Sequence, residues 1–436
     1  MRELRDPQET EMPLLVPVLR NPGKGFYALI LALGLLIGWA FFAWMWQLLH
    51  GQVVTGLNRP VYWGIYVTNF IFFIGISHAG TLISAILRIT QAEWRRPVTR
   101  IAEAITVFAL MVGPINILFD LGRPDRVYYI IPFLWYGRYQ SPLLWDFTCI
   151  NLYLVASLTY LYLPLIPDIA RVRDRLDRKD WRWKWYHRLA LGWQGTEKQK
   201  RRLEKMIGGM AIFIIPVAVS VHTVVSWVPA MTVQPMWHST IFGPYFVVGA
   251  IFSGIASLLI AMAILRKVFH LEAYLKPIHF NYLGLLLLTM TCLWFYFTFA
   301  EYLTTFYGQE PPHLRVFNAK LQGPYAPLFW TMVFFCFVIP FFILAIKKTR
   351  TVTGTVIASI LINIGMWIER YTILIPTQIH PRMAYPRGAY TPSWVEISIT
   401  LGLVAGFVLL YALFAKFFPI VSVWEVEAGS RKDEQD

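Results

Sequence analysis

Ionisable side chains inside long apolar stretches are the residues of this 436-residue sequence with the clearest capacity for chemistry. Two of its nine histidines, His78 and His222, lie within such stretches. Six carboxylates lie within the stretches or at their ends: Glu103, Asp120, Asp146, Glu301, Glu369 and Glu396. An ionisable group in hydrocarbon is costly unless it is paired or hydrated, so each of these residues is a candidate for function.

Not every carboxylate in this set needs a chemical role. A residue within one helical turn of a membrane surface can simply be hydrated, and we expect this for Glu103 and Glu396. Hydration explains Asp146 less well, because it follows the apolar residues Pro142–Trp145, and Glu369 less well, because the adjacent Arg370 can neutralise it. The other seven histidines lie in or beside predicted loops, and we interpret them as surface groups: His50, His187, His238, His270, His279, His313 and His380.

The two membrane histidines are expected at different depths. Counted at roughly 1.5 Å per residue from the ends of their predicted spans on one side, His78 lies about 24 Å deep and His222 about 9 Å deep. This mismatch argues against a haem held by both rings. No CxxCH motif occurs, and the three cysteines stand alone in apolar runs, so we expect neither haem nor another metal in the chain.

The elements that carry these residues are predicted to be ten transmembrane helices. The chain is 57% hydrophobic and only 15% charged, whereas soluble domains average about 25% charged residues. A helix needs about 20 apolar residues to cross a bilayer. Ten segments meet that length: 26–49, 62–89, 99–119, 143–165, 207–228, 242–265, 280–305, 325–346, 354–375 and 393–417. The predicted fold class is therefore an all-α, polytopic integral membrane protein.

The basic residues predict the orientation of these helices. Most of the 39 Lys and Arg residues fall on one side of the predicted spans, which places both termini in the cytoplasm by the positive-inside rule. Residues 1–25 and 418–436 are then cytoplasmic, and 26–417 form the membrane domain. The net charge of +14 thus reflects topology rather than nucleic-acid binding. The largest connection, 166–205, is rich in basic residues that could bind anionic lipid or a partner, although a solvated topology determinant is the favoured interpretation.

Imidazoles and carboxylates grouped in helices on one side of a membrane suit more than one function. They can accept the protons that a quinol releases on oxidation. They can equally line the proton or ion path of a transporter, and Pro114 and Pro340 inside predicted spans are compatible with the interrupted helices of transporters. A structural anchor with ion-paired polar groups is the third possibility. The residue types alone leave these three open.

Several motifs resemble a known family in order along the chain. They are Trp63-Gly64-Ile65-Tyr66, the run Gly75–Leu87 around His78, Phe119-Asp120-Leu121-Gly122-Arg123-Pro124, Ser141–Asp146, Ser220–Trp227 around His222, Thr240–Phe246, Ala300-Glu301-Tyr302 and Asn363–Tyr371. Together they resemble the polysulfide reductase membrane subunit (NrfD-like) family. More narrowly, they are similar to its ten-helix members in alternative complex III, a quinol oxidoreductase.

The resemblance implies where a quinol would bind. Spans 2–5 (62–228) would form a four-helix bundle that holds menaquinol or ubiquinol near the outer face, and spans 6–9 (242–375) would form a second bundle. The implied pocket residues are His78, Asp120, Arg123, Asp146 and His222, with Trp227 and Tyr66 as weaker lining candidates. Asp146 and His222, together with the deeper His78, are the expected catalytic groups, and Arg123 could orient Asp120. A proton path is expected through His78, Glu301, Glu369 and Arg370.

The resemblance also implies partners and a location. Electrons would pass to an iron–sulfur subunit and a multihaem cytochrome c subunit, beside a homologous membrane subunit, in the inner membrane of a prokaryote. A quinone-reducing anchor of a sulfur-metabolism or other molybdopterin and iron–sulfur complex is the alternative within the family. A stand-alone proton-coupled secondary transporter is the alternative of another class.

Overall fold

The computed structural model describes residues 14–131, 140–383 and 388–427, and within these ranges the regular elements are all helical. Ten helices, two of them interrupted, are long and apolar enough to cross a membrane, which confirms the predicted fold class. Their bounds are α2 (Lys24–His50), α3 (Ile65–Ile89), α4 with α5 (Thr99–Val112 and Ile115–Asp120), α7 (Pro142–Arg175), α9 (Glu197–Ala230), α10 (Phe242–Val268), α11 (Pro277–Gly308), α13 with α14 (Ala326–Val333 and Ile339–Ala345), α15 (Val352–Ile379) and α16 (Trp394–Phe417).

The two interruptions have a local cause in the sequence. Pro114 lacks a backbone N–H, and the chain breaks there between α4 and α5. Between α13 and α14 the helix widens into one π-helical turn, Phe334–Val338, immediately before Pro340. Such turns are rare and occur mostly as single bulges within an otherwise continuous α-helix.

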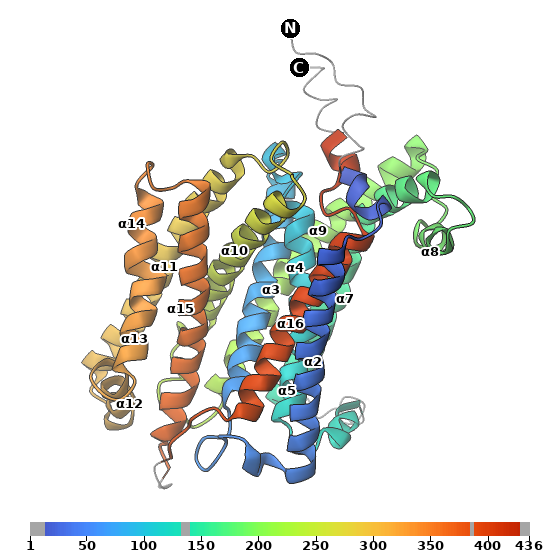
Figure 1. Cartoon of the computed structure of the whole chain (residues 1–436). Helices are drawn as coiled ribbons and strands as arrows, with labels where there is room; N and C mark the ends of the chain where they lie inside the picture. The colour runs from blue at the N-terminus through green and yellow to red at the C-terminus, as the bar shows by residue number, and fades with distance from the viewer. Residues whose placement is uncertain (1–13, 132–139, 384–387, 428–436) are drawn as a thin grey trace.

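The helices pack as two groups around α3. In the first group α3 contacts α4 and α9, and α7 contacts α9 and α4, so these four helices form a ring. In the second, α10, α11, α13–α14 and α15 contact one another, and α10 also packs on α3 and α9. The α2–α16 pair lies against α4 and α3 (Figure 1). In its most apolar part α3 is 82% buried and α2 only 17%, so α3 is the central helix and α2 lies on the outside of the bundle.

Both ends of the described chain lie at one end of the bundle (Figure 1). We call this the termini end, and the opposite end the far end. A short helix, α8 (Trp181–Leu189), lies at the termini end, and another, α12 (Pro311–Leu321), lies at the far end. The side chains that the sequence singles out can be placed by their distance from these two ends.

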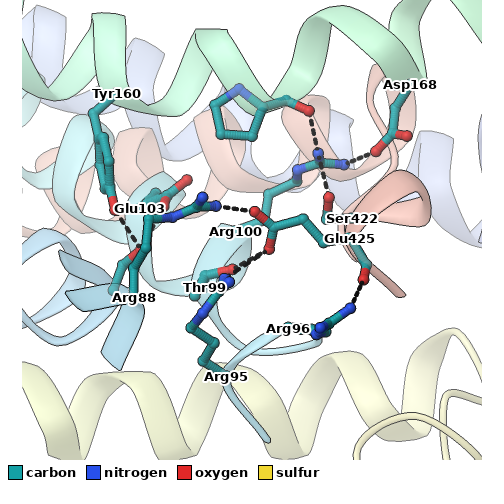
Figure 2. A network of polar contacts seen from close by, with 12 residues as sticks. Arg88, Arg95, Arg96, Thr99, Arg100, Glu103, Tyr160, Asp168, Ser422 and Glu425 are labelled. Atoms are coloured by element: carbon teal, nitrogen blue, oxygen red, sulfur yellow. Dashed lines mark hydrogen bonds and ion pairs between the residues drawn. The ribbon is translucent and has the colours of Figure 1, made fainter. Parts of the chain in front are cut away.

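A buried ion pair fastens the segment after α16 to the bundle at the termini end (Figure 2). Arg100 donates to Asp168 at 2.6 Å, and both side chains are buried. Asp168 also accepts the backbone N–H groups of Val423 at 3.0 Å and Trp424 at 3.1 Å. Because a buried charge is costly without partners, these bonds fix the last described residues against α4 and α7.

Glu425 extends the same network (Figure 2). Its carboxylate accepts from Arg88 on α3 and from Arg95, the latter at 3.2 Å. Arg96 donates to its backbone carbonyl at 2.7 Å. The segment after α16 therefore ties α3 to the turn before α4.

Two carboxylates expected to be hydrated are in fact buried. Glu396 is the third residue of α16, and its carboxylate accepts from Gly56 N–H, the Tyr390 hydroxyl and Ser393 N–H at 2.7–2.8 Å. It closes a capping box with Ser393, so it caps the start of α16 at a buried position. Glu103 is likewise buried and accepts from Ser84 at 2.6 Å.

Candidate functional site

His78 on α3 and His222 on α9 lie in direct contact, with ring centroids 4.2 Å apart. The expectation of different depths is therefore wrong. It assumed that the far ends of the two helices are level, but His78 is thirteen residues into α3 and His222 eight residues before the end of α9. Since the rings touch, the far ends are offset by about 8 Å along the helix axes.

The His78 ring is held by backbone groups on both edges. Its Nδ1 lies 2.8 Å from the Ile74 carbonyl oxygen and its Nε2 2.7 Å from the Ala218 carbonyl oxygen on α9. The Tyr153 ring on α7 lies 5.0 Å from it. Both ring nitrogens are thus directed at carbonyls, which does not suit a ring that must bind a haem iron, even though the depth argument against haem fails.

His222 has a different environment. It is fully buried, yet neither ring nitrogen has a hydrogen-bond partner among the described residues. Buried polar groups are nearly always hydrogen-bonded, and an exception calls for an explanation. Its neighbours are His78 and the Phe246 ring of α10, whose centroid lies 6.2 Å away. An unused donor and acceptor at the centre of the bundle make His222 a candidate to bind a polar ligand.

Arg370 connects this pair of histidines to the second group of helices. Its guanidinium carbon lies 4.6 Å from the centre of the Phe246 ring. Gly249 on α10 makes room for it, because a Cβ there would come within 2.6 Å of Arg370 Nη2. Arg370 Nη1 lies 3.1 Å from Glu369 Oε2, and Trp294 on α11 donates to Glu369 Oε1 at 2.5 Å. The Glu369–Arg370 pair is buried and sits one ring away from His222.

Lys320 completes a cluster of four charges, and sequence reasoning missed it. It lies near the end of α12, which is not among the membrane-length helices, yet its side chain is only 3% exposed. With Glu301 and Glu369 it lines an internal cavity of about 20 Å³. That volume suffices for about one water molecule. One oxygen of Glu301 and one of Glu369 have no hydrogen-bond partner among the described residues, so the cavity has polar groups left to bind such a water.

Burial lowers the pKa of Lys320 from 10.5 to about 8, against the opposing effect of Glu301 and Glu369. Glu301 also lines a second, open recess of about 480 Å³ at the far end, together with His238, His313 and Arg382. Burial lowers the pKa of His238 there, and the charges of His313 and Arg382 act in the same direction. Glu301 therefore lines both the recess at the far end and the small cavity beside Glu369.

The other predicted pocket residues do not gather at the histidine pair. Tyr66 is buried and donates to Gln47 on α2 at 2.7 Å. Gln47 in turn donates to the carbonyl of Phe119, the residue before Asp120. Tyr66 stands about 18 Å before His78 along α3, so this group belongs to the far end of the bundle. Asp120 Oδ1 has no hydrogen-bond partner among the described residues.

Asp146 lies between these two levels. It is seven residues before Tyr153 on α7, or about 10 Å closer to the far end. Its Oδ1 is buried and has no hydrogen-bond partner within the described ranges. Because α7 packs directly on α9, Asp146 and His222 stand on neighbouring helices as expected, both with polar atoms unused.

The positions of Arg123 and Trp227 do not favour the predicted roles of these two residues in a quinol pocket. Arg123 does not orient Asp120 but pairs with Asp125 at 2.9 Å, and its side chain is 64% exposed. The short spacing between the two residues brings them together in the loop after α5. Trp227 is 45% exposed on the outside of α9. Neither residue is placed at the centre of the bundle.

A second polar line leads from His78 toward the termini end. On α3, Thr81, Ser84 and Arg88 follow His78 at the three- and four-residue spacings that put them on one face. Ser84 donates to Glu103 at 2.6 Å, and its hydroxyl oxygen lies 3.3 Å from the Tyr160 hydroxyl on α7. Arg88 then reaches Glu425 in the network of Figure 2. Hydroxyl and carboxyl groups thus continue beyond the histidine pair to the termini end.

Comparison with known proteins assigns the chain to a family. Residues 53–382, most of the chain, match the family Polysulphide reductase, NrfD. The chain therefore belongs to this family of polytopic membrane proteins, as the motifs suggested. The matched range includes both histidines, the Glu369–Arg370 pair and Lys320.

Relatives of known name resemble the chain over nearly its full length. A Halobacterium salinarum protein, named as a membrane subunit of dimethyl sulfoxide reductase, is 26% identical, covering 91% of this chain and 92% of its own. An Archaeoglobus fulgidus protein named Hdr-like menaquinol oxidoreductase integral membrane subunit is 24% identical, covering 92% and 95%. A Nitratidesulfovibrio vulgaris protein named menaquinone reductase, integral membrane subunit, is 22% identical, covering 88% and 89%.

Proposed function

We propose that this chain is the quinol-binding membrane subunit of a multi-subunit oxidoreductase of the alternative complex III type. It oxidises a quinol and passes the electrons to partner subunits. The observation that carries the proposal is His222, a buried imidazole with both nitrogens unused at the point where α3, α9 and α10 meet. An imidazole in this state can take a proton from a quinol hydroxyl as electrons leave the ring.

Asp146 is the second proton acceptor in this proposal. Quinol oxidation releases two electrons and two protons, so two acceptors are needed at or near the bound ring. Asp146 has an unused buried oxygen on the helix next to His222 and lies closer to the far end. His78 lies against the His222 ring, but both of its nitrogens face the carbonyls of Ile74 and Ala218, so its role in this proposal is to position His222.

The names of the relatives support menaquinone as the substrate class. Two of the three relatives are named as menaquinol or menaquinone oxidoreductase subunits, and all three are named as membrane subunits. We therefore propose menaquinol, with ubiquinol as the alternative quinol. The proposed electron acceptors are an iron–sulfur subunit and a multihaem cytochrome c subunit, with a homologous membrane subunit beside them. The proposed location is the inner membrane of a prokaryote with the termini end in the cytoplasm.

A proton route accompanies the redox reaction in this proposal. Glu301, the cavity beside Lys320 and the Glu369–Arg370 pair form a polar series from the far-end recess, and the Phe246 ring separates its inner end from the two histidines. Each member is buried and charged, polar or able to hold a water. Such a series can carry the released protons away from the quinol site.

The test is quinol-driven reduction of the partner subunits in the purified complex, reconstituted in liposomes with menaquinol. General acid–base groups contribute about 10²–10⁴-fold to rate, so Asp146→Asn and His222→Ala should each lower turnover at least about 100-fold. Asp125→Asn and His50→Ala are matched controls on exposed residues and should turn over normally. Wild-type rates in Asp146→Asn and His222→Ala, with assembly intact, would refute the proposal.

A quinone-reducing subunit is the second candidate, because one relative is named as a menaquinone reductase. The same acceptors would then donate protons to the quinone. The two directions are separated by supplying either reduced partner subunits and quinone or menaquinol and oxidised partners, and measuring which reaction the complex sustains. Reduction of quinone by reduced partner subunits, with no oxidation of menaquinol by oxidised partner subunits, would replace the first candidate with the second.

A further inference from the structure

The short helix α8 is fixed at the level where the membrane helices end. Tyr186 on α8 is buried and donates to the carbonyl of Phe417, the last residue of α16, at 2.6 Å. Tyr162, still within the apolar part of α7, donates to the carbonyl of Leu189 at 2.5 Å. Helix α8 is therefore tied to the termini ends of α7 and α16 and lies to the side of the bundle (Figure 1).

One face of α8 is exposed, and it combines tryptophans with cations. At 100° per residue, Lys184, Arg188, Trp181 and Trp185 fall on one contiguous face, opposite the side that Tyr186 packs against the bundle. Trp181 is 65% exposed and Trp185 57%, and Lys184 and Arg188 are also exposed. The Arg188 guanidinium lies 6.0 Å from the centre of the Trp185 ring.

This combination is suited to the headgroup layer of a membrane. Tryptophan is enriched at membrane–water interfaces, and Lys and Arg side chains attract the anionic lipids of the same layer. Short amphipathic helices with tryptophan beside basic residues lie in this plane. The depth of α8, fixed by Tyr162 and Phe417, brings its exposed face to that layer.

The basic run just before α8 is not equally free. Arg171 pairs with Glu427 at 2.5 Å, and Arg173 pairs with Asp174 at 2.7 Å. Two arginines of the run that ends α7 are thus already paired with carboxylates, whereas Lys184 and Arg188 on α8 are exposed.

We propose that Trp181, Lys184, Trp185 and Arg188 form a binding site for an anionic phospholipid in the leaflet at the termini end. The two cations contact the phosphate of the headgroup, and the two indoles lie at the boundary between headgroups and acyl chains. Through Tyr162 and Tyr186, a lipid held here anchors the ends of α7 and α16. This inference is independent of the proposed redox function.

The experiment titrates phosphatidylglycerol into the purified, delipidated complex in mild detergent and counts bound lipids by native mass spectrometry. Lys184→Gln/Arg188→Gln should weaken the tightest lipid site roughly 30-fold, given the contribution of each basic residue near anionic lipid. Lys347→Gln/Lys348→Gln is the matched control, since it removes two exposed cations from the loop before α15 at the same end. The control should bind like the wild type.

A second variant separates a site from general charge attraction. Trp181→Ala/Trp185→Ala keeps every charge and should also weaken the tightest phosphatidylglycerol site. Phosphatidylcholine should bind equally to the wild type and to all variants. If Lys347→Gln/Lys348→Gln weakens phosphatidylglycerol binding as much as Lys184→Gln/Arg188→Gln does, the proposal is overturned, because the lipid is then attracted to the whole charged surface. Unchanged lipid binding in both α8 variants would also overturn it. Loss of a copurifying subunit with unchanged lipid binding would identify the face as a protein interface instead.

Discussion

Raising the pH through about 8 should slow quinol turnover by discharging Lys320. Burial places the pKa of Lys320 near 8, so roughly nine in ten of these lysines are charged at pH 7 and roughly one in ten at pH 9. The charge balances Glu301 and Glu369 in a cavity that holds about one water. If only the charged form supports proton movement past these carboxylates, the rate falls about tenfold between pH 7 and pH 9.

The predicted loss of turnover between pH 7 and pH 9 cannot be explained by Lys320 destabilising the folded protein. The unfolded lysine has a pKa of 10.5, above its folded value of about 8. Between these two values the unfolded chain binds more protons, so the contribution of Lys320 to stability rises with pH in that window. A loss of activity centred near pH 8 would therefore reflect the state of the cavity.

Two substitutions make the prediction decisive. Lys320→Arg keeps a charge that does not titrate in this range, so turnover should stay level from pH 7 to pH 9. Lys320→Met should be slow at both pH values, below the rate of the wild type at pH 9, because its side chain is never charged. The assay is menaquinol-driven reduction of the partner subunits in liposomes buffered equally on both sides. A wild-type inflection that persists in Lys320→Arg, or a Lys320→Met protein as fast as the wild type at pH 7, would refute the reasoning.

Three further predictions concern stability and are measured by thermal unfolding in detergent. Asp168→Asn should lower the free energy of unfolding by about 3–5 kcal/mol, because it leaves a buried arginine unpaired, and should expose the segment after α16 to protease. Trp294→Phe removes the N–H donated to Glu369 and should cost about 1.5–3 kcal/mol; an unchanged melting temperature would show that this bond contributes nothing. Gly80→Ala should cost about 1–3 kcal/mol, since its Cβ would meet backbone and hydroxyl atoms of α4, whereas Gly209→Ala, with open space around it, should be neutral or stabilising.

The membrane helices could be predicted well because their signal is local. A run of apolar residues long enough to cross a bilayer needs no knowledge of its neighbours, and all ten predicted spans correspond to helices. The ends of the helices were predicted less well. Helix α9 begins at Glu197, before the predicted span 207–228, because the helix continues into the charged connection. The capping box of Ser393 and Glu396 was a readable signal that Glu396 is not simply hydrated.

The candidate site could be predicted only in part, because its geometry depends on contacts between distant elements. The sequence identifies His78 and His222 as buried polar residues, but how far one helix is displaced along another is set by side-chain packing. Lys320 was missed for a similar reason. It lies in a connection between spans, where a lysine is normally exposed. The packing of α12 buries it, so that it lines the same cavity as Glu301.

The arrangement of these groups explains how redox chemistry and proton movement could be coupled without a long conformational pathway. Helix α10 belongs to the second group of helices but packs on both α3 and α9 of the first. Its Phe246 lies next to His222 and beneath Arg370, so the proposed quinol acceptor and the ion pair share one neighbour. A change of charge at His222 acts on Arg370 across a single aromatic ring in a medium of low dielectric constant, where such interactions are strong. Coupling at this junction therefore requires only local electrostatics, because α10 places the two groups within one side chain of each other.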